Sequence, residues 1–249
     1  MSLTFNDTTT YRGIIQQIES NIKAPVGWIS GNTVRLKQFT ADINLALDRV
    51  VELIFQHNGT WQFDDSNHTD YPFITTTLTS GQRDYPFTTD EQSNLILDIY
   101  KVMIKQGTAA TDYYTEIYPV DQVTEKGKES FFSGQDATGI PYRYDKTANG
   151  IFLDPVPNYT VASGLKVFIN REASYFISTD TTKKPGFAGL FHEYLALQPS
   201  YKYALRNGLK NANVLKNETL EMENQIEVYY SQRSRDEKQR IIPAYRSSR

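Results

Sequence analysis

Helical and β-strand periodicities occupy separate stretches of this 249-residue chain, and their order constrains the fold more than any other feature. Apolar residues recur every three or four positions near both ends, whereas the middle alternates and is rich in Thr and aromatic residues. A pair of helices at one end would bury too little surface to stand alone. We therefore expect both ends to form one helical domain, from which the β-rich stretch leaves and returns as an insertion.

Two helices are predicted before the insertion. The first follows the threonines at 8–10, whose hydroxyls suit a helix N-cap, and the second ends near Gly59, a residue suited to a left-handed C-terminal cap. One face of the first helix carries Ile14, Ile15, Ile18 and Ile22, and one face of the second carries Leu36, Phe39, Ile43, Leu47, Val50 and Ile54.

Two leucines of the second helix, Leu45 and Leu53, fall outside its apolar stripe. They indicate a second apolar neighbour for this helix. We assign them to the interface with a neighbouring subunit, and the alternative is another wall of the subunit's own core.

Helical spacing returns after Lys184. Pro199 lies within the next predicted helix, where a missing backbone N–H favours a kink, and a last helix is expected over about 212–235. The first of these helices is predicted to bury Leu190, Tyr194, Leu197, Tyr201 and Leu205, and the second Leu215, Met222, Ile226 and Tyr229.

The middle of the chain predicts at least seven strands, more than one small sheet normally holds. Ser80-Gly81-Gln82 is expected to turn one hairpin, and Ala148-Asn149-Gly150 another. A short polar helix is expected around 120–129. The predicted strands are 72–79, 83–87, 94–105, 113–118, 141–146, 150–154 and 164–171.

These patterns predict an α+β protein in which the N- and C-terminal segments form a four-helix bundle and an antiparallel β-sandwich or barrel-like domain is inserted between them. The predicted parts are a helical domain in two pieces, 1–69 and 183–235, an inserted β-domain at 70–182, and a C-terminal docking tail at 236–249.

Composition excludes several classes of protein. The net charge of −3 argues against a protein that grips duplex DNA, which needs a clustered basic surface. Cysteine is absent, so disulfides and thiolate chemistry are excluded. No stretch approaches the run of about 20 apolar residues that spans a bilayer, and residues 1–13 lack a signal-peptide pattern. We expect synthesis in a cytoplasm and no membrane partner.

Residues that commonly carry catalysis are few and form no specific motif. Of three histidines, only His192 begins one, because His192-Glu193 resembles a zinc-protease helix, but the second ligand position holds Ala196. A satisfied histidine is the simpler interpretation. Three acids in the polar connector, Asp64, Asp65 and Asp70, suit a solvated loop better than a glycosidase or cation site. We predict no enzyme, no cofactor and no metal.

The C-terminal tail is the clearest candidate interaction segment. Six basic and two acidic side chains lie between Ser231 and Arg249. Apolar anchors among arginines indicate a segment that orders on a partner with an apolar groove and acidic rims, and the alternative is a solvated, disordered end. The predicted docking residues are Arg240, Ile241, Ile242, Tyr245, Arg246 and Arg249.

Three segments resemble adaptor proteins of the head–tail connectors of tailed phages. The first, at 139–157, reads GIPYRYDKTANGIFLDPVP and is followed by a strand ending in Arg171. The second joins Leu47-Asp48-Arg49 to the WQFDD sequence at 61–65, and the third is FAGLFHEYLALQPSYKY at 187–203. Their order and spacing carry the resemblance.

The resemblance implies a structural virion protein. Family members have a helical core with a β-domain, form a ring of twelve beneath the portal protein, and continue the DNA channel toward the tail, with the C-terminal segment on the portal. It therefore implies a homo-oligomeric ring, a portal partner, a downstream tail or nozzle partner, and transient passage of DNA. The alternative function is a carbohydrate-binding or glycan-cleaving β-sandwich protein.

Overall fold

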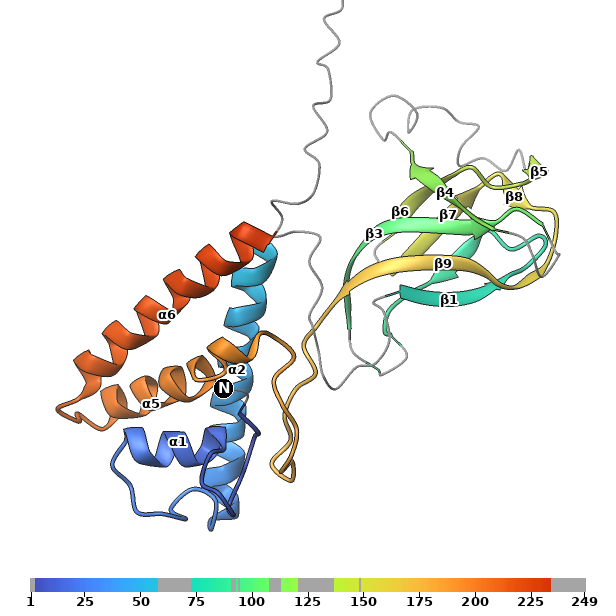
Figure 1. The fold of residues 1–249 in the computed structure, drawn as a ribbon. Coiled ribbons are helices and arrows are strands. Elements are labelled where there is room, and N and C mark those ends of the chain that lie inside the picture. Colours follow the sequence, from blue (N-terminus) through green and yellow to red (C-terminus); the bar gives the residue numbers. More distant parts are fainter. Residues whose placement is uncertain are drawn as a thin grey trace, which may run out of the picture. The chain divides into compact units, whose positions relative to one another are not determined.

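The computed structural model divides the chain into two units (Figure 1). The helical unit comprises Met1–Asn67 and Tyr175–Arg249, and the β unit comprises His68–Ser174. The structure describes residues 3–57, 73–90, 93, 95–107, 113–120, 137–147 and 149–233. The predicted cap at Gly59, the acidic connector, the helix at 120–129 and the C-terminal docking tail lie outside these residues.

The described part of the helical unit contains four α-helices. They are α1 (Ile14–Asn21), α2 (Thr33–His57), α5 (Tyr194–Arg206) and α6 (Ala212–Arg233), with a 3-10 turn, η1 (Gly189–Phe191), before α5. Helix α5 contacts α1, α2 and α6, and α2 also contacts α6. Because α5 has neighbours on three sides, it forms the centre of this unit.

The predicted stripe of α2 is confirmed, since all six of its members are buried. The start of α1 is corrected. The threonines at 8–10 do not cap it, because Gly13 is its N-cap residue and makes no side-chain capping bond. Instead, the Asp7 carboxylate accepts hydrogen bonds from the N–H groups of Thr9 (3.0 Å) and Thr10 (2.9 Å), which forms a separate turn.

The predicted face of α5 is correct only in part. Tyr194 and Leu197 are buried, but Leu190 and Leu205 are exposed. Burial on α5 instead extends to residues off the predicted stripe, including Leu195, Ala196 and Ser200. A helix with neighbours on three sides buries most of its circumference, so a single-stripe pattern does not describe it.

The predicted four-helix bundle is wrong. Helix α1 has 8 residues and α2 has 25, so at 1.5 Å per residue they are about 12 Å and about 38 Å long. In Figure 1, α1 and α5 run across α2 rather than alongside it. A bundle requires helices of similar length lying nearly parallel. These helices bury their apolar faces by crossing one another instead.

The β unit is one curled mixed sheet, so the prediction of an antiparallel β-sandwich or barrel-like domain is also wrong. Seven of the described strands form it, in the order β1-β9-β3-β4-β6-β7-β2, and β4 pairs with β6 in parallel. A short parallel pair, β5 with β8, is separate. The strands are β1 (Phe73–Leu78), β2 (Asp84–Pro86), β3 (Ile96–Lys105), β4 (Tyr114–Pro119), β5 (Thr138–Gly139), β6 (Arg143–Thr147), β7 (Gly150–Asp154), β8 (Val156–Pro157) and β9 (Val161–Arg171).

Only one of the two predicted hairpins forms. Strands β6 and β7 pair antiparallel, with Thr147 opposite Gly150, as predicted. Strands β1 and β2, by contrast, pair with β9 and β7 and lie at opposite edges of the sheet. The sheet curls far enough that Tyr85 of β2 accepts, at its hydroxyl, a hydrogen bond from the N–H of Thr79, just after β1 (2.9 Å).

The core of the β unit lies inside this curl and takes side chains from both edges of the sheet. Its buried residues are Leu78, Tyr85, Phe87, Ile99, Val102, Ile104, Ile117, Tyr144, Ile151, Leu153, Val161, Leu165, Val167 and Ile169. At one end of the curl, Arg171 and Asp90 form a buried ion pair with a separation of 3.2 Å. The curl therefore lets one sheet enclose a core without a second sheet.

Candidate functional site

The outward face of α2 is the first candidate surface. Leu45 and Val34 are 55% and 65% exposed, and Ala41 between them is also exposed. These three residues lie on the opposite side of α2 from its buried stripe, at spacings of seven and four residues that bring them to one helix face. We call them the α2 outer face. Leu45 therefore lies where a neighbouring subunit could contact it.

Leu53, the other residue assigned to a subunit interface, lies in a different place. It is 1% exposed and packs inside the helical unit. The sequence left open whether Leu53 contacts a neighbouring subunit or its own core, and its burial places it in the subunit's own core. The structure therefore does not bring Leu45 and Leu53 together on one surface.

A polar network fixes α2, α5 and α6 against one another. The Tyr194 hydroxyl donates a hydrogen bond to Glu223 Oε1 (2.6 Å), and Arg49 lies 3.5 Å from Glu223 and 2.8 Å from Glu52. Burial, and then the hydrogen bond to Glu223, raises the pKa of Tyr194. The network places one side chain from α5 and one from α2 on the same α6 carboxylate, so it sets the spacing of the three helices.

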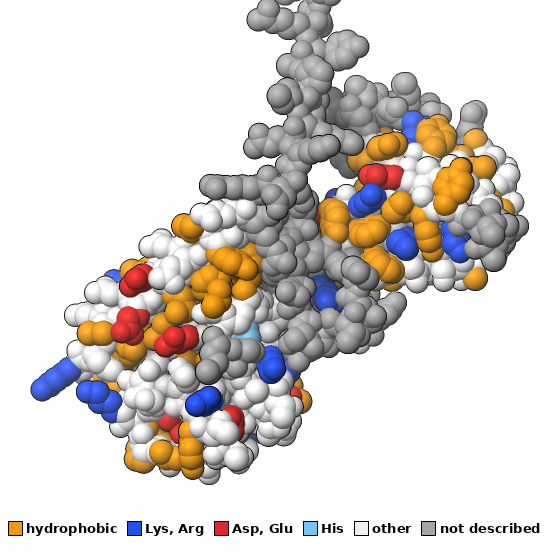
Figure 2. All heavy atoms as spheres, in the orientation of Figure 1, with side chains coloured by type: hydrophobic (Ala, Val, Ile, Leu, Met, Phe, Trp, Pro, Cys, Tyr) orange, Lys and Arg blue, Asp and Glu red, His pale blue; other side chains and the backbone are white. Residues whose placement is uncertain are grey.

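The groove between α5 and α6 is the second candidate surface. It has a volume of about 270 Å³ and is lined by Glu193 and Leu197 on the α5 side and by Glu218, Glu221, Met222 and Gln225 on α6. Leu197 and half-buried Met222 form its floor, and the three glutamates are exposed around it. In Figure 2, acidic side chains gather beside apolar ones over α5 and α6. We call this the α5–α6 groove.

His192 is a satisfied core histidine, as the simpler interpretation of the sequence predicted. It is 2% exposed. Its Nδ1 accepts a hydrogen bond from the N–H of Leu3 (3.0 Å), and its Nε2–H donates one to the Phe187 carbonyl oxygen (2.9 Å). Burial lowers the pKa of His192, so the neutral ring is the folded form. The ring therefore ties the N-terminal residues to the start of α5.

We expect the helical unit to lose stability as the pH falls below about 6.5, the ordinary pKa of histidine. The unfolded chain then binds a proton at His192 that the folded chain does not, so protonation favours unfolding. Urea unfolding followed by circular dichroism at 222 nm, at pH 7.5 and pH 5.0, measures the difference. The variant His192→Gln should be less stable at pH 7.5 but show a smaller loss at pH 5.0. An unchanged pH dependence in that variant would exclude His192 as its source.

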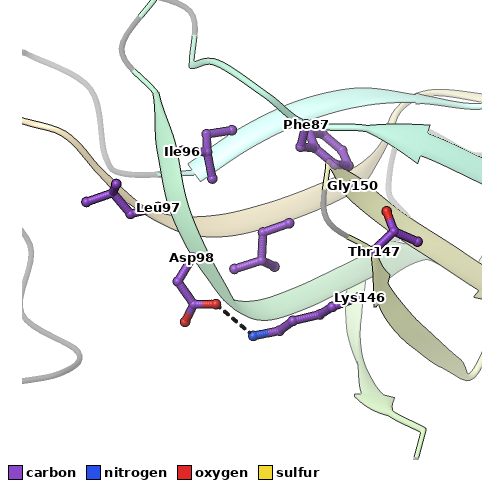
Figure 3. A pocket seen from close by; sticks show the side chains of 8 residues that line it. Phe87, Ile96, Leu97, Asp98, Lys146, Thr147 and Gly150 are labelled. Carbon is purple, nitrogen blue, oxygen red and sulfur yellow. Dashed lines mark hydrogen bonds and ion pairs between the residues drawn. The ribbon is translucent and has the colours of Figure 1, made fainter.

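The β unit has a small pocket beside the first residues of β3, Ile96 to Ile99 (Figure 3). Its volume is about 80 Å³, and an ion pair of 2.9 Å between Asp98 and Lys146 lies beside it. Ligand pockets for drug-sized molecules hold roughly 300–1,000 Å³. The pocket is therefore large enough for a few water molecules beside the ion pair but too small for a drug-sized molecule.

The outer face of the sheet interleaves lysines with aromatic rings, a surface that sequence alternation alone did not identify. Lys166 Nζ lies 4.5 Å from the centre of the Phe73 ring and 4.1 Å from that of Tyr114. Lys101 lies 5.8 Å from the Phe168 ring and pairs with Glu116 at 3.2 Å. Figure 2 shows apolar and basic side chains side by side over this face. Because ammonium groups already lie over ring faces, cation–π contacts account for much of this arrangement.

The predicted docking residues of the tail, Arg240 to Arg249, lie outside the described residues. Within the residues that the structure describes, no group of three or more His, Asp or Glu side chains could hold a metal ion. Across the same residues, no helix combines the length and apolar character of a membrane span.

Comparison of the sequence with models of known protein families gives no match, and comparison with curated proteins also gives none.

Sequence reasoning missed the α5–α6 groove, although part of its signal is local. Glu218 and Glu221 lie three residues apart, so they share one side of α6 beside Met222. What the sequence did not show is that Glu193 and Leu197 meet this side from α5. That requires the packing of two helices, which the spacing within either one does not specify.

Proposed function

We propose that the chain is a structural virion protein, a head-to-tail adaptor that forms a ring beneath the portal protein and continues the DNA channel toward the tail. Copies of the chain form the ring, and neighbouring copies contact one another through the α2 outer face. Its other partners are the portal protein, a downstream tail or nozzle protein, and DNA in transit. The protein has no catalytic role in this proposal and acts at the head–tail junction of the particle.

The α2 outer face is the observation that carries this proposal. Helix α2 buries one full stripe in its own subunit, yet it presents Val34, Ala41 and Leu45 to solvent on the opposite side. A helix that exposes apolar side chains opposite its buried stripe suits a contact repeated from subunit to subunit. Head-to-tail contacts of this kind close into a ring when the rotation between subunits is a full turn divided by a whole number, without translation along the axis.

Two of the three segments that resemble head–tail adaptors lie within the described elements. The stretch at 139–157 contains the β6–β7 hairpin, and the stretch at 187–203 contains η1 and most of α5. The net charge of −3 also suits a conduit, because a strongly basic lumen would retain DNA through counterion release. In this proposal, Arg240, Ile241, Ile242, Tyr245, Arg246 and Arg249 contact the portal.

We expect Leu45→Glu to prevent ring assembly while the subunit remains folded. An exposed leucine tolerates a charge in the free subunit, but burying that charge in an apolar contact weakens association by at least about tenfold. Native mass spectrometry of the purified chain with portal rings, and incorporation into portal-bearing heads, measure the loss. The matched control is Leu205→Glu, an exposed leucine on α5 (61%) outside the α2 outer face.

Comparing the two variants shows whether a loss of assembly comes from the α2 outer face or from adding a charge anywhere on the surface. If Leu45→Glu joins portal-bearing heads as efficiently as the unchanged chain, the α2 outer face is not the ring contact. If Leu205→Glu fails equally, the loss has no specificity for α2. A folded Leu45→Glu subunit is checked by its circular dichroism spectrum and unfolding midpoint.

The alternative, a glycan-binding β protein, has one observation in its favour. Tyr118 and Tyr142 are 66% and 60% exposed at the parallel β4–β6 junction, and exposed aromatic rings can stack on sugars. Cations lie over rings on both surfaces, since Lys166 lies over Phe73 and Tyr114 of the outer face and Arg143 lies 5.3 Å from the centre of the Tyr142 ring. Binding on a glycan array that disappears in Tyr118→Ala/Tyr142→Ala would favour this alternative over the adaptor.

A further inference from the structure

The α5–α6 groove has the chemistry of a peptide-binding surface. Leu197 and Met222 provide an apolar floor, and Glu193, Glu218 and Glu221 surround it. Among the described residues, no ion pair involves any of these three glutamates. Carboxylates without a cationic partner around an apolar floor favour a segment that combines apolar anchors with basic side chains.

We propose that this groove binds the C-terminal segment of the same chain, residues 236–249. The segment carries Ile241, Ile242 and Tyr245 as apolar anchors, and Lys238, Arg240, Arg246 and Arg249 as cations. The anchors match the floor, and the cations on both sides of them match the glutamates. This inference does not depend on the adaptor function, because it concerns the free subunit.

The chain length allows this contact within one subunit. Gln225, at the groove, precedes the end of α6 at Arg233 by eight residues, which is about 12 Å along a helix. Ile241 follows Arg233 by eight residues and can reach up to about 26–29 Å if extended. The segment can therefore turn back along α6 and place its anchors over the groove.

Attachment to the same chain also strengthens a weak contact. A short flexible connection gives its two ends an effective concentration in the millimolar range, so the segment binds its own groove in preference to another copy at micromolar protein concentrations. Exposed ion pairs contribute little individually, and the apolar anchors are expected to supply most of the affinity.

The absence of cysteine from the chain makes a disulfide-trapping experiment specific. The test variant is Gln225→Cys/Ala244→Cys, with one cysteine at the groove and one between the anchors of the segment. The matched control is Asn224→Cys/Ala244→Cys, because Asn224 is the adjacent exposed residue of α6 and does not line the groove. Oxidation at micromolar protein concentration is followed by non-reducing electrophoresis and mass spectrometry.

We expect the monomeric disulfide of the test variant to form at least about tenfold faster than that of the control, since docking raises the local thiol concentration at the groove alone. Adding Glu218→Arg and Glu221→Arg should reduce the difference between the two rates, because like charges then oppose the apolar contact. Further adding Arg240→Glu and Arg246→Glu should restore the difference, because the charges are then exchanged. High salt should reduce the difference in the original pair.

Equal rates in the test variant and its control would overturn the proposal. So would disulfide-linked dimers whose yield rises with protein concentration, because they would show that the groove takes the segment of a second copy. A rate difference that is undiminished after the charge reversal would exclude recognition by the glutamates. None of these outcomes affects the adaptor proposal, which Leu45→Glu tests separately.

Discussion

Replacing Glu19 with alanine is expected to destabilise the helical unit by about 3–5 kcal/mol, because three backbone N–H groups lose their common acceptor. Glu19 is 3% exposed on α1. Its carboxylate accepts hydrogen bonds from the N–H groups of Gly27 (3.0 Å), Ile29 (2.7 Å) and Ser30 (3.0 Å). The carboxylate thus accepts the hydrogen bonds of loop N–H groups that, in a helix or strand, would pair with backbone carbonyl groups.

The same loop holds Trp28, so the effect of Glu19→Ala can be observed directly. The Trp28 ring packs 6.4 Å from Phe39 and 5.7 Å from Tyr203, measured between ring centres. Urea unfolding followed by Trp28 fluorescence, with Trp61→Phe to remove the only other tryptophan, should show an earlier transition.

Two variants complete the Glu19 experiment. Glu19→Gln keeps one carbonyl oxygen but loses the charge and one acceptor, so an intermediate loss is expected. Glu218→Ala removes an exposed carboxylate without an ion pair in the described structure and should change stability by less than about 0.5 kcal/mol. A loss below about 1 kcal/mol for Glu19→Ala would show that water replaces the carboxylate at the loop.

Gly150→Ala is expected to displace strand β2 and destabilise the β unit by about 3 kcal/mol or more, an overpacking cost at the upper end of the usual range. A Cβ atom at Gly150 would lie 2.2 Å from the Tyr85 carbonyl oxygen and 2.9 Å from Pro86 Cα. Both are backbone atoms of β2, so no side-chain rotation relieves the clash. Hydrogen exchange measured by mass spectrometry should show faster exchange in β2 and β7.

Gly81→Ala is the matched control for Gly150→Ala. Gly81 has φ of +79° and no atom within 4 Å of an added Cβ, so its substitution carries only the backbone strain of a left-handed residue, roughly 1–2 kcal/mol. Equal losses in the two variants would show that close approach of β2 is not what requires glycine at 150. The sequence suggested a turn role for Gly150, but the residue begins β7 and is needed for this approach.

Local patterns predicted the elements whose neighbours are near in sequence. The stripe of α2 follows from one amphipathic period, because every member faces the same side of a single helix. The β6–β7 hairpin follows from two short strand segments separated by the turn signal Ala148-Asn149-Gly150, although Gly150 itself begins β7. In both cases the physical information lies within about 25 residues of chain, the length of α2 itself.

Only tertiary structure decided how these elements pair. Strands β1 and β2 are separated by only five residues, yet they lie at opposite edges of a curled sheet. Strand β1 pairs with β9 and β2 pairs with β7, and this pairing buries Leu78 and Tyr85 inside the curl. Likewise, four predicted helices indicated a bundle, but α1 and α5 run across α2 instead of alongside it (Figure 1).

The candidate surfaces also include features that the sequence predicted and features that only the structure showed. The sequence by itself determined that Leu45 lies off the buried stripe of α2 and that the C-terminal segment combines anchors with cations. It did not determine that Leu53 is core, that His192 binds Leu3 from across the chain, or that Glu193 joins Glu218 and Glu221 at one groove. Periodicity specifies which way a side chain points from its own helix, whereas contacts between helices depend on packing angles that no single segment encodes.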